Sequence, residues 1–288
     1  MFIENPKIGY FEKLFSESTD LYESKQAQFY GEALYERITS LVPLEEIEII
    51  SFDVFDTLLL RNNKYELYRF LEMSEILHEN LTKKGIESLS VWDIYAARLT
   101  AFKTCYRTVT PTSTIREGRL IDVMSLMAKI LDLDVWIVPE MVRIELTYEQ
   151  KNLRVNPILQ SFLNHPEIKQ KKIIFISDMY ISGDWINQLV KLYYPDLDLL
   201  NYYSSADYSL TKSSGLLYDK VIQDLQVSRS AMVHLGDNLH SDIQQAKERG
   251  IRGIHLPIPD VILKQRKIEK KQFEAELIAQ GFDISLVR

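Results

Sequence analysis

The sequence IEIISFDVFDT, residues 47–57, decides the fold. An apolar run that begins at Ile47 leads directly into Asp53. A short run rich in isoleucine that ends in polar residues is typical of a strand buried in a parallel sheet. Two later runs have the same form and end in polar residues: residues 173–176 before Ser177 and Asp178, and residues 232–235 before Gly236 and Asp237.

These three strands predict an α/β fold with a Rossmann-like parallel sheet as its core, because a helical pattern follows each of them. In an open parallel sheet the ligand site lies at the carboxyl ends of the strands. Each of the three runs delivers a carboxylate or a hydroxyl group to that edge. We therefore expect Asp53, Ser177 and Asp237 to lie close together.

Composition excludes several classes of protein. The chain has 288 residues, which is enough for about two domains. Its 34 Lys and Arg residues against 41 Asp and Glu residues give a net charge of −7, which argues against a nucleic-acid-binding protein. One cysteine, Cys105, excludes an internal disulfide. No run approaches the roughly 20 apolar residues of a membrane span and no signal peptide is recognisable, so we expect a soluble cytoplasmic protein.

The helical patterns define the remaining domains. They fill residues 62–170, a stretch too long for a connection between strands, which predicts a helical cap inserted after the first strand. The core is then expected to comprise residues 47–61 and 171–258. Residues 1–46 are predicted to form a helical extension with three inward side chains: Phe29, Leu34 and Ile38. Residues 259–288 are predicted to contain a last helix with four: Ile262, Ile268, Phe273 and Leu277.

The polar residues near the strand ends have the chemistry of phosphoryl transfer. A carboxylate such as that of Asp53 can attack phosphorus and become a phosphoaspartate. The Ser177 hydroxyl can donate a hydrogen bond to a phosphate oxygen, and Lys212 can neutralise negative charge on a nucleophile or phosphate. Asp237 and Asp242 share one strand-to-helix loop, and two carboxylates there suit a hard divalent cation such as Mg²⁺.

Taken in order, four segments resemble the haloacid dehalogenase (HAD) superfamily of phosphohydrolases and phosphotransferases. They are DVFDT (53–57), Ser177, TKSSG (211–215) and GDNLHSD (236–242). The resemblance covers the sheet domain, about 46–61 and 171–258. It implies a HAD-like core with the inserted helices as its cap.

The resemblance also implies roles for individual residues. Asp53 would be the nucleophile, Ser177 would bind the phosphoryl group, and Lys212 would be the charge-neutralising lysine. Asp242 would support the metal shell or orient Lys212. The cofactor would be Mg²⁺, with these ligands: Asp53, the Phe55 carbonyl, Asp237 and Asp242. The substrate would contact these side chains: Ser177, Thr57, Asp178 and Asn238.

Three longer strings look like a subgroup of predicted hydrolases that often occur beside or fused to glycosyltransferases of bacterial surface-polysaccharide synthesis. They are FDVFDTLLLR (52–61), SDMY (177–180) and HLGDNLHSD (234–242). This likeness implies a sugar-linked context. If the chain is a non-catalytic module, the N-terminal extension would dock on a glycosyltransferase or on a second copy of the chain.

The first of these strings departs from the superfamily pattern. Phosphatases of the superfamily usually place a second aspartate two residues after the nucleophile, as general acid and base, and Phe55 stands there. General acid–base catalysis is worth about 10²- to 10⁴-fold in rate. A good leaving group, as in an acyl or anomeric phosphate, would make its loss tolerable. Otherwise another acid must substitute, and the candidates are Asp56, Glu145, Glu149 and His165.

These residues predict an Mg²⁺-dependent phosphohydrolase that acts through an aspartyl-phosphate on a small phosphorylated metabolite, with transfer to a second substrate as a variant. The alternative is a catalytically weakened or inactive module that docks on a glycosyltransferase or self-associates. A dehalogenase would also carry an aromatic residue at position 55. Halide displacement needs no metal, however, and Asp237 and Asp242 would repel a carboxylate substrate.

Overall fold

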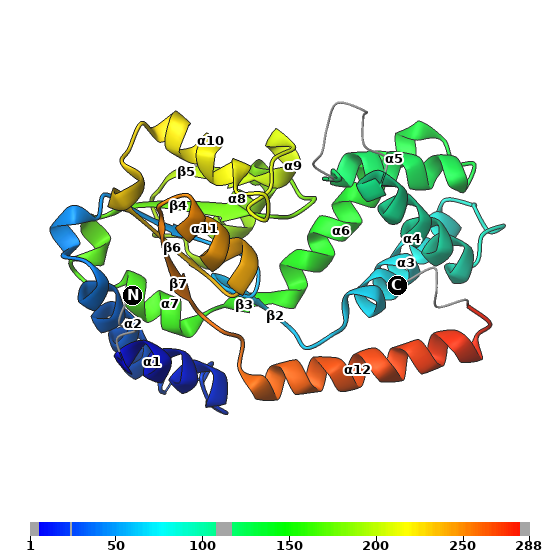
Figure 1. The fold of residues 1–288 in the computed structure, drawn as a ribbon. Helices are drawn as coiled ribbons and strands as arrows, with labels where there is room; N and C mark the ends of the chain where they lie inside the picture. Colours follow the sequence, from blue (N-terminus) through cyan, green and yellow to red (C-terminus); the bar gives the residue numbers. More distant parts are fainter. Residues whose placement is uncertain (1–5, 24, 108–116, 283–288) are drawn as a thin grey trace. The chain divides into compact units, whose positions relative to one another are not determined.

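The computed structural model describes residues 6–23, 25–107 and 117–282. The chain forms two compact units (Figure 1). The first unit runs to Arg61 and resumes over Arg154–Met179 and Gly183–Leu263. The second unit comprises Asn62–Leu153, Tyr180–Ser182 and the chain from Lys264 onward.

The first unit is built on a five-stranded parallel sheet with the strand order β5-β4-β1-β6-β7. The strands are β1 (Ile49–Phe52), β4 (Lys172–Ser177), β5 (Leu199–Ser204), β6 (Met232–Gly236) and β7 (Arg252–His255). Every residue of the central strand β1 is buried, as expected where helices cover both faces of a sheet. A separate two-stranded sheet pairs β2 (Leu59–Arg61) with β3 (Leu153–Val155). The predicted α/β fold with a parallel core is confirmed.

Helices connect the strands of this unit. The α-helices are α1 (Pro6–Glu17), α2 (Ala27–Leu41), α7 (Pro157–Leu163), α8 (Gly183–Tyr193), α9 (Ser205–Tyr208), α10 (Leu216–Leu225) and α11 (Gln245–Glu248). Shorter turns are η1 (Leu44–Glu46), η3 (Ile168–Gln170), η4 (Arg229–Ala231) and the π-helical η5 (Leu239–Gln244). The residues at the start of α7 show why a helix begins there. Asn156 accepts a hydrogen bond from the Ile158 amide at 3.1 Å, and Pro157 occupies the first turn, where its missing N–H is no loss.

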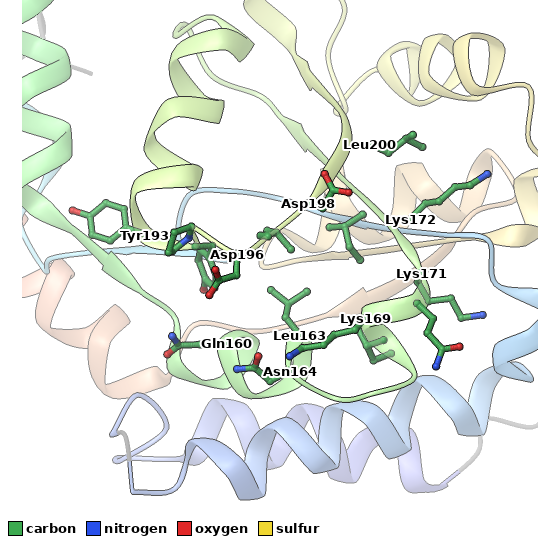
Figure 2. Close-up of a pocket in the computed structure, with 16 residues that line it drawn as sticks. Gln160, Leu163, Asn164, Lys169, Lys171, Lys172, Tyr193, Asp196, Asp198 and Leu200 are labelled. Carbon is green, nitrogen blue, oxygen red and sulfur yellow. The ribbon is translucent and has the colours of Figure 1, made fainter.

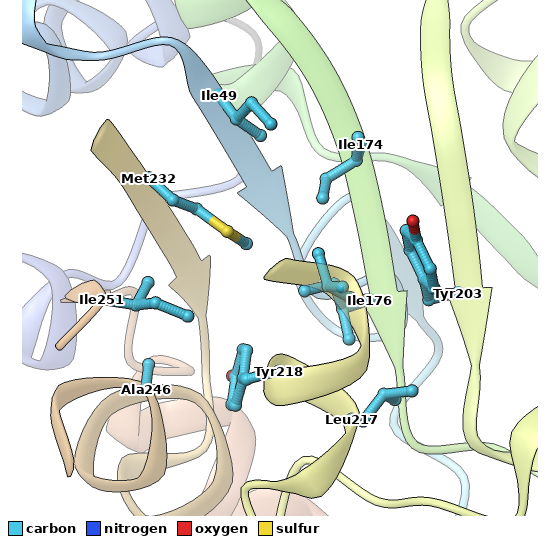
Figure 3. Close-up of a cluster of buried hydrophobic side chains, with 10 residues drawn as sticks. Ile49, Ile174, Ile176, Tyr203, Leu217, Tyr218, Met232, Ala246 and Ile251 are labelled. Carbon is cyan, nitrogen blue, oxygen red and sulfur yellow. The ribbon is translucent and has the colours of Figure 1, made fainter. Parts of the chain in front are cut away.

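Each face of the sheet is sealed by different helices. On one face, side chains of α10 and α11 pack against the strands (Figure 3). This cluster includes Leu217, Tyr218 and Ala246 from the helices, and Ile49, Ile174, Ile176 and Met232 from the strands. On the opposite face, Phe162 of α7 meets Phe52 edge to face, with ring centroids 6.4 Å apart. Helix α2 packs in turn against α7.

The second unit is helical and has its own core. Its elements are α3 (Glu66–Lys83), α4 (Val91–Arg107), α5 (Leu120–Ile130), η2 (Val135–Ile137), α6 (Val138–Asn152) and most of α12 (Asp260–Ala279). Four of these helices supply its apolar cluster: Leu67, Phe70, Met73, Tyr95, Leu99, Tyr148, Phe273 and Leu277. A capping box opens α4, because Ser90 Oγ accepts the Asp93 amide at 3.2 Å and Asp93 Oδ2 accepts the Ser90 amide at 2.8 Å.

Two buried ion pairs tie α6 to its neighbours. Glu145 pairs with Arg98 of α4 at 2.8 Å, and Glu149 pairs with Arg69 of α3 at 2.8 Å. All four side chains are at most 8% exposed. The Tyr180 hydroxyl adds a hydrogen bond of 2.5 Å to Glu145. Because the two glutamates are four residues apart, they project from the same side of α6.

The observed division differs from the predicted domain boundaries. The helical pattern assigns residues 62–170 to the insertion, whereas residues 154–170 lie with the sheet. Two hydrogen bonds from Asn156 to the loop after β1 explain this: its Nδ2 donates to the Thr57 carbonyl at 2.8 Å, and its amide donates to the Leu58 carbonyl at 3.1 Å. The C-terminal helix is also divided between the units, after Leu263.

Two side chains that the periodicity places inward are exposed. Phe29 on α2 is 59% exposed, although Leu34 and Ile38 are buried. Ile268 on α12 is 56% exposed, because only the C-terminal part of that helix enters the apolar cluster. Among the described residues, no helix is long and apolar enough to span a membrane.

The Arg98–Glu145 pair yields a stability prediction. Glu145→Gln leaves the Arg98 charge buried without its partner, so the free energy of unfolding should fall by about 3–5 kcal/mol. Glu140→Gln is the control on the same helix, because Glu140 pairs with the exposed Arg143 and its loss should cost at most about 1 kcal/mol. Urea denaturation of both variants measures the difference. Equal losses would contradict the expected effect of burial.

Candidate active site

The strand register brings the predicted site residues to one edge of the sheet. Phe52 at the end of β1 is aligned with Phe175 of β4 and with Leu235 of β6. Asp53 therefore lies one residue beyond this level. Ser177 and Asp237 each lie two residues beyond it on the flanking strands, at the carboxyl edge where the sequence predicts the ligand site.

A buried ammonium group is the centre of this edge. Lys212 Nζ donates to Asp53 Oδ1 at 2.5 Å and to Asp242 Oδ1 at 2.6 Å. The lysine side chain is 2% exposed, and those of Asp53 and Asp242 are 11% and 1% exposed. Because so little water screens these charges, the contacts are far stronger than the same pairs on a surface. Oδ2 of Asp53 accepts no hydrogen bond from the described residues.

The electrostatics of the site follow from burial and from an excess of carboxylates. Burial raises the pKa of Asp53 to about 7, against the attraction of Lys212. Burial and the charges of Asp53, Asp56 and Asp242 raise the pKa of Asp237 to about 8. Although burial opposes it, Lys212 holds the pKa of Asp242 well below its usual value. The two carboxylates likewise keep the pKa of Lys212 well above its usual value despite burial, so the lysine stays charged.

The loop before α10 holds Lys212 in place. Both oxygens of Asp178 accept backbone hydrogen bonds from this loop, from the Lys212 amide at 2.7 Å and the Ser213 amide at 3.2 Å. Gly215 ends the loop with a φ of +77°, a conformation that favours glycine. The Arg249 guanidinium packs there and donates to the Ser214 carbonyl at 3.1 Å. Both carboxylate oxygens of Asp178 thus position the lysine loop, and the contact of Asp178 with substrate stays a prediction.

Asp242 is positioned equally closely. Its Oδ2 accepts the Asn238 amide at 3.0 Å, and its Oδ1 lies 3.3 Å from His234 Nε2. A Cβ on Gly236 would come within 2.2 Å of Oδ2, so only glycine leaves room for this carboxylate. The geometry therefore shows Asp242 orienting Lys212, and its role as a metal ligand stays a prediction.

His234 and Ser51 are site residues that the sequence analysis did not assign. They are register partners on β6 and β1, and Ser51 Oγ lies 2.7 Å from His234 Nδ1. Burial lowers the pKa of His234, so the ring is neutral and links Ser51 to Asp242. The sequence did hold a signal for these two residues, because each is a polar residue in an otherwise apolar strand. Ser51 stands two positions before Asp53, and His234 stands three positions before Asp237.

The donor set fits a divalent cation. Carboxylate oxygens of Asp53, Asp237 and Asp242 all lie within 4.8 Å of one another. With Lys212 the four ionised groups sum to a charge of −3 + 1 = −2, which one Mg²⁺ would neutralise. Among the described residues, nothing donates a hydrogen bond to the Asp237 carboxylate or to the Phe55 carbonyl, so both oxygens are available as ligands. Oxygen ligands of this kind are those that Mg²⁺ prefers.

The turn after Asp53 gives Asp56 a structural role. Its φ is +62°, and its Oδ1 accepts the Arg61 amide at 3.3 Å, while its own amide donates to the Leu59 carbonyl at 2.8 Å. Asp56 thus closes the turn between β1 and β2, which leaves Phe55 at the position of the usual acid. The Thr57 hydroxyl is buried and has no hydrogen-bond partner among the described residues.

The other candidate acids are engaged in contacts of their own. Glu145 and Glu149 are committed to the buried ion pairs of the second unit. His165 follows α7 and stacks on Tyr35 of α2, with ring centroids 3.7 Å apart. Asn238 Oδ1 caps η5 by accepting the amides of His240 and Ser241 at 3.0 Å, and the contact of Asn238 with substrate stays a prediction. Ser177 and Thr57 stay predicted substrate contacts.

A cavity of about 670 Å³ lies elsewhere in the first unit. It is lined by the start of β4 and by the connection between α8 and β5 (Figure 2). Lys172 and Ile173 line it, so it opens at the amino end of β4, whereas Ser177 stands at the carboxyl end. None of the three clustered carboxylates lines this cavity.

Neither a protein-family model nor a curated protein matches the chain. Solved structures resemble it. A 2-haloacid dehalogenase from Pseudomonas syringae pv. Tomato DC3000 has 16% identity and a TM-score of 0.48, over 73% of this chain and 86% of that chain. A HAD family enzyme from Bacteroides thetaiotaomicron, in complex with magnesium and inorganic phosphate, has 12% identity and a TM-score of 0.46, over 73% and 93%.

The L-2-haloacid dehalogenase from Xanthobacter autotrophicus has 14% identity and a TM-score of 0.40, over 71% of this chain and 75% of that chain. At such identities and TM-scores, the chemistry of this chain has to be inferred from its own residues.

The carboxylate cluster predicts metal-dependent stability. Mg²⁺ at 100 times its Kd should stabilise the fold by about 2.7 kcal/mol, because it binds the folded state alone. Asp237→Asn should abolish this increase. Without metal the same variant should be at least as stable as the wild type, because one of three clustered buried carboxylates loses its charge.

Thermal unfolding with and without Mg²⁺ measures both effects. Asp224→Asn, which changes an exposed aspartate of α10, is the matched control and should keep the full Mg²⁺ response. An undiminished response in Asp237→Asn would show that the cation binds elsewhere.

Proposed function

We propose that the chain is a HAD-type phosphohydrolase that acts through a phosphoaspartate at Asp53. The observation that carries this proposal is the Lys212 ammonium, buried between Asp53 and Asp242 at 2.5 and 2.6 Å. A carboxylate that only terminated a strand would not need a buried cation fixed by a second carboxylate. A nucleophile that must approach an anionic phosphoryl group does need one.

In the first half of the reaction, the unoccupied Oδ2 of Asp53 attacks phosphorus. The bond from phosphorus to the leaving oxygen breaks, and its electron pair departs on that oxygen. Lys212 offsets the negative charge of the nucleophile and the phosphoryl group. The Ser177 hydroxyl, which donates to no other described residue, is free to donate to a phosphoryl oxygen.

Asp53, Asp237 and the Phe55 carbonyl would hold Mg²⁺, which when bound supplies further neutralisation of the phosphoryl charge. In the second half, water attacks phosphorus of the phosphoaspartate, releases phosphate and regenerates the Asp53 carboxylate. Lys212, kept charged by Asp242, again faces the reacting oxygens of Asp53. His234 and Asp178 act by positioning Asp242 and Lys212.

The proposed substrate is a small phosphorylated metabolite. The resemblance of the motif strings to hydrolases that accompany glycosyltransferases supports a sugar-linked compound and a glycosyltransferase as partner. One observation favours the second candidate, a weakened or inactive module: Phe55 occupies the position of the general acid. The other candidate acids are engaged in different contacts, namely Asp56, Glu145, Glu149 and His165.

Turnover distinguishes the two candidates. Wild-type protein with Mg²⁺ should release phosphate from acyl, aryl or alkyl phosphates, and Asp53→Asn should abolish the release, because it removes the nucleophilic oxygen. The same change removes one of the two charges beside Lys212, so thermal unfolding of Asp53→Asn has to show that the variant is folded. Asp224→Asn is the control for an aspartate outside the site. Phosphate release that survives Asp53→Asn would contradict the mechanism. No release by the wild type would favour the inactive module.

Phe55 at the position of the usual acid predicts a steep dependence on the leaving group. An acyl phosphate releases a weakly basic carboxylate that needs no proton, whereas an alkyl phosphate releases a strongly basic alkoxide that does. Rates on alkyl phosphates should lack the roughly 10²- to 10⁴-fold gain that an acid supplies. Asp56→Asn should leave the profile unchanged, because asparagine can still accept the Arg61 amide. Similar wild-type rates on both substrate classes, lost in Asp56→Asn, would identify Asp56 as the acid.

A further inference from the structure

Arg61, the last residue of β2, places a permanent cation against the two loops of the candidate site. Its guanidinium carbon lies 4.2 Å from the centroid of the Phe55 ring. Its Nη2 lies 3.8 Å from the sulfur of Met179. Phe55 follows Asp53 by two residues and Met179 follows Ser177 by two residues, so Arg61 touches both loops just beyond the groups assigned to the phosphoryl group.

We propose that Arg61 is a specificity residue that binds the leaving group and selects substrates whose leaving group departs as a carboxylate or phosphate anion. The substrate class is then acyl phosphates and phosphoanhydrides rather than alkyl phosphate esters. This inference rests on the proposed phosphohydrolase function and names the substrate class of the same site.

The position of Arg61 follows from the direction of attack. Asp53 attacks from the end of β1, so in an in-line displacement the leaving oxygen lies opposite Asp53, on the side away from the sheet. We assign this side to the residues further along the two loops, Phe55 and Met179, with Arg61 packed against both. The turn that carries Arg61 is closed by the hydrogen bond from its amide to Asp56.

The chemistry of a guanidinium determines which leaving groups it can serve. Arginine does not release a proton in this pH range, so Arg61 cannot replace the missing general acid. Its planar donors instead match the two oxygens of a carboxylate or phosphate. When the phosphorus–oxygen bond breaks, the electron pair stays on an oxygen that becomes part of such an anion, and no proton is required. An alkoxide would remain a strong base, which a charge alone does not relieve.

Kinetics on three substrates test the selection. In Arg61→Gln, kcat/KM for acetyl phosphate and inorganic pyrophosphate should fall by about 10²- to 10³-fold, the effect of removing an oxyanion-stabilising donor. For 4-nitrophenyl phosphate, whose charge spreads over the ring, the fall should stay below about tenfold. Arg61→Lys should give intermediate losses, because it keeps the charge without the paired donors. Equal losses on all substrates, or none, would overturn the proposal.

Arg154→Gln is the matched control, because Arg154 is an exposed arginine of the first unit over the ring of Tyr22, at 5.7 Å. It should leave all three rates unchanged. Thermal unfolding of Arg61→Lys and Arg61→Gln shows whether each variant is folded, and a folded Arg61→Lys keeps the test decisive if Arg61→Gln unfolds.

A binding experiment separates this proposal from the proposed function. Methylenediphosphonate, which cannot be hydrolysed, should bind about 10- to 100-fold more weakly to Arg61→Gln than to wild type in Mg²⁺, whereas inorganic phosphate should bind equally. If Arg61→Gln binds the diphosphonate more weakly but the wild type hydrolyses none of the substrates, the anion subsite at Arg61 is supported and the phosphohydrolase function is rejected. Turnover by the wild type with unchanged diphosphonate binding would reject the subsite and leave the phosphohydrolase intact.

Discussion

The contact between the Lys212 ammonium and two carboxylates is the constraint that organises the first unit. A charged lysine that is 2% exposed is stable only where opposite charges compensate its lost hydration. Asp53 supplies that compensation from the end of β1, and Asp242 supplies it from η5, which follows the neighbouring strand β6. Asp178 fixes the lysine backbone from the end of β4. The conformation of each of these loops therefore depends on the others, because all of them contact Lys212.

This arrangement also explains residues that seem unrelated to chemistry. Gly236 has no side chain because the Asp242 carboxylate occupies the space. Ser51 and His234 are polar in apolar strands because Asp242 needs a neutral partner on its second side. The third carboxylate, Asp237, forms no ion pair with a cation among the described residues, and the charges of the neighbouring carboxylates outweigh the attraction of Lys212. This excess of negative charge suits a divalent metal.

Much of the fold could be predicted from the sequence, because a parallel strand that is buried on both faces has a continuous apolar sequence. The runs ending at Asp53, Ser177 and Asp237 identified three of the five strands and the edge where they meet. The boundary between the helical insertion and the sheet unit could not be predicted, because α7 has the same apolar pattern whether it packs on a sheet or on other helices. The hydrogen bonds that place the start of α7 beside the sheet join Asn156 to Thr57 and Leu58, about a hundred residues earlier in the chain.

Within the site, residue types were predictable and side-chain directions were not. Asp178 and Asn238 stand beside strand ends, where a carboxylate or an amide can face a ligand or its own backbone, and the spacing is the same in both cases. The structure turns both toward backbone amides. Arg61 carried no motif of its own, because its place depends on a turn that brings β2 back beside Phe55.

The two buried ion pairs of α6 have a consequence for assembly of the second unit. Glu145 requires Arg98 from α4, and Glu149 requires Arg69 from α3, one turn apart on a single helix. A half-built arrangement, with only one partner helix docked, would leave one glutamate charge desolvated and uncompensated. Rotating α6 about its axis, or sliding it by one residue, would separate both pairs at once. Partly docked states and states with a shifted α6 are therefore both unfavourable. We expect α3, α4 and α6 to associate in a single cooperative step.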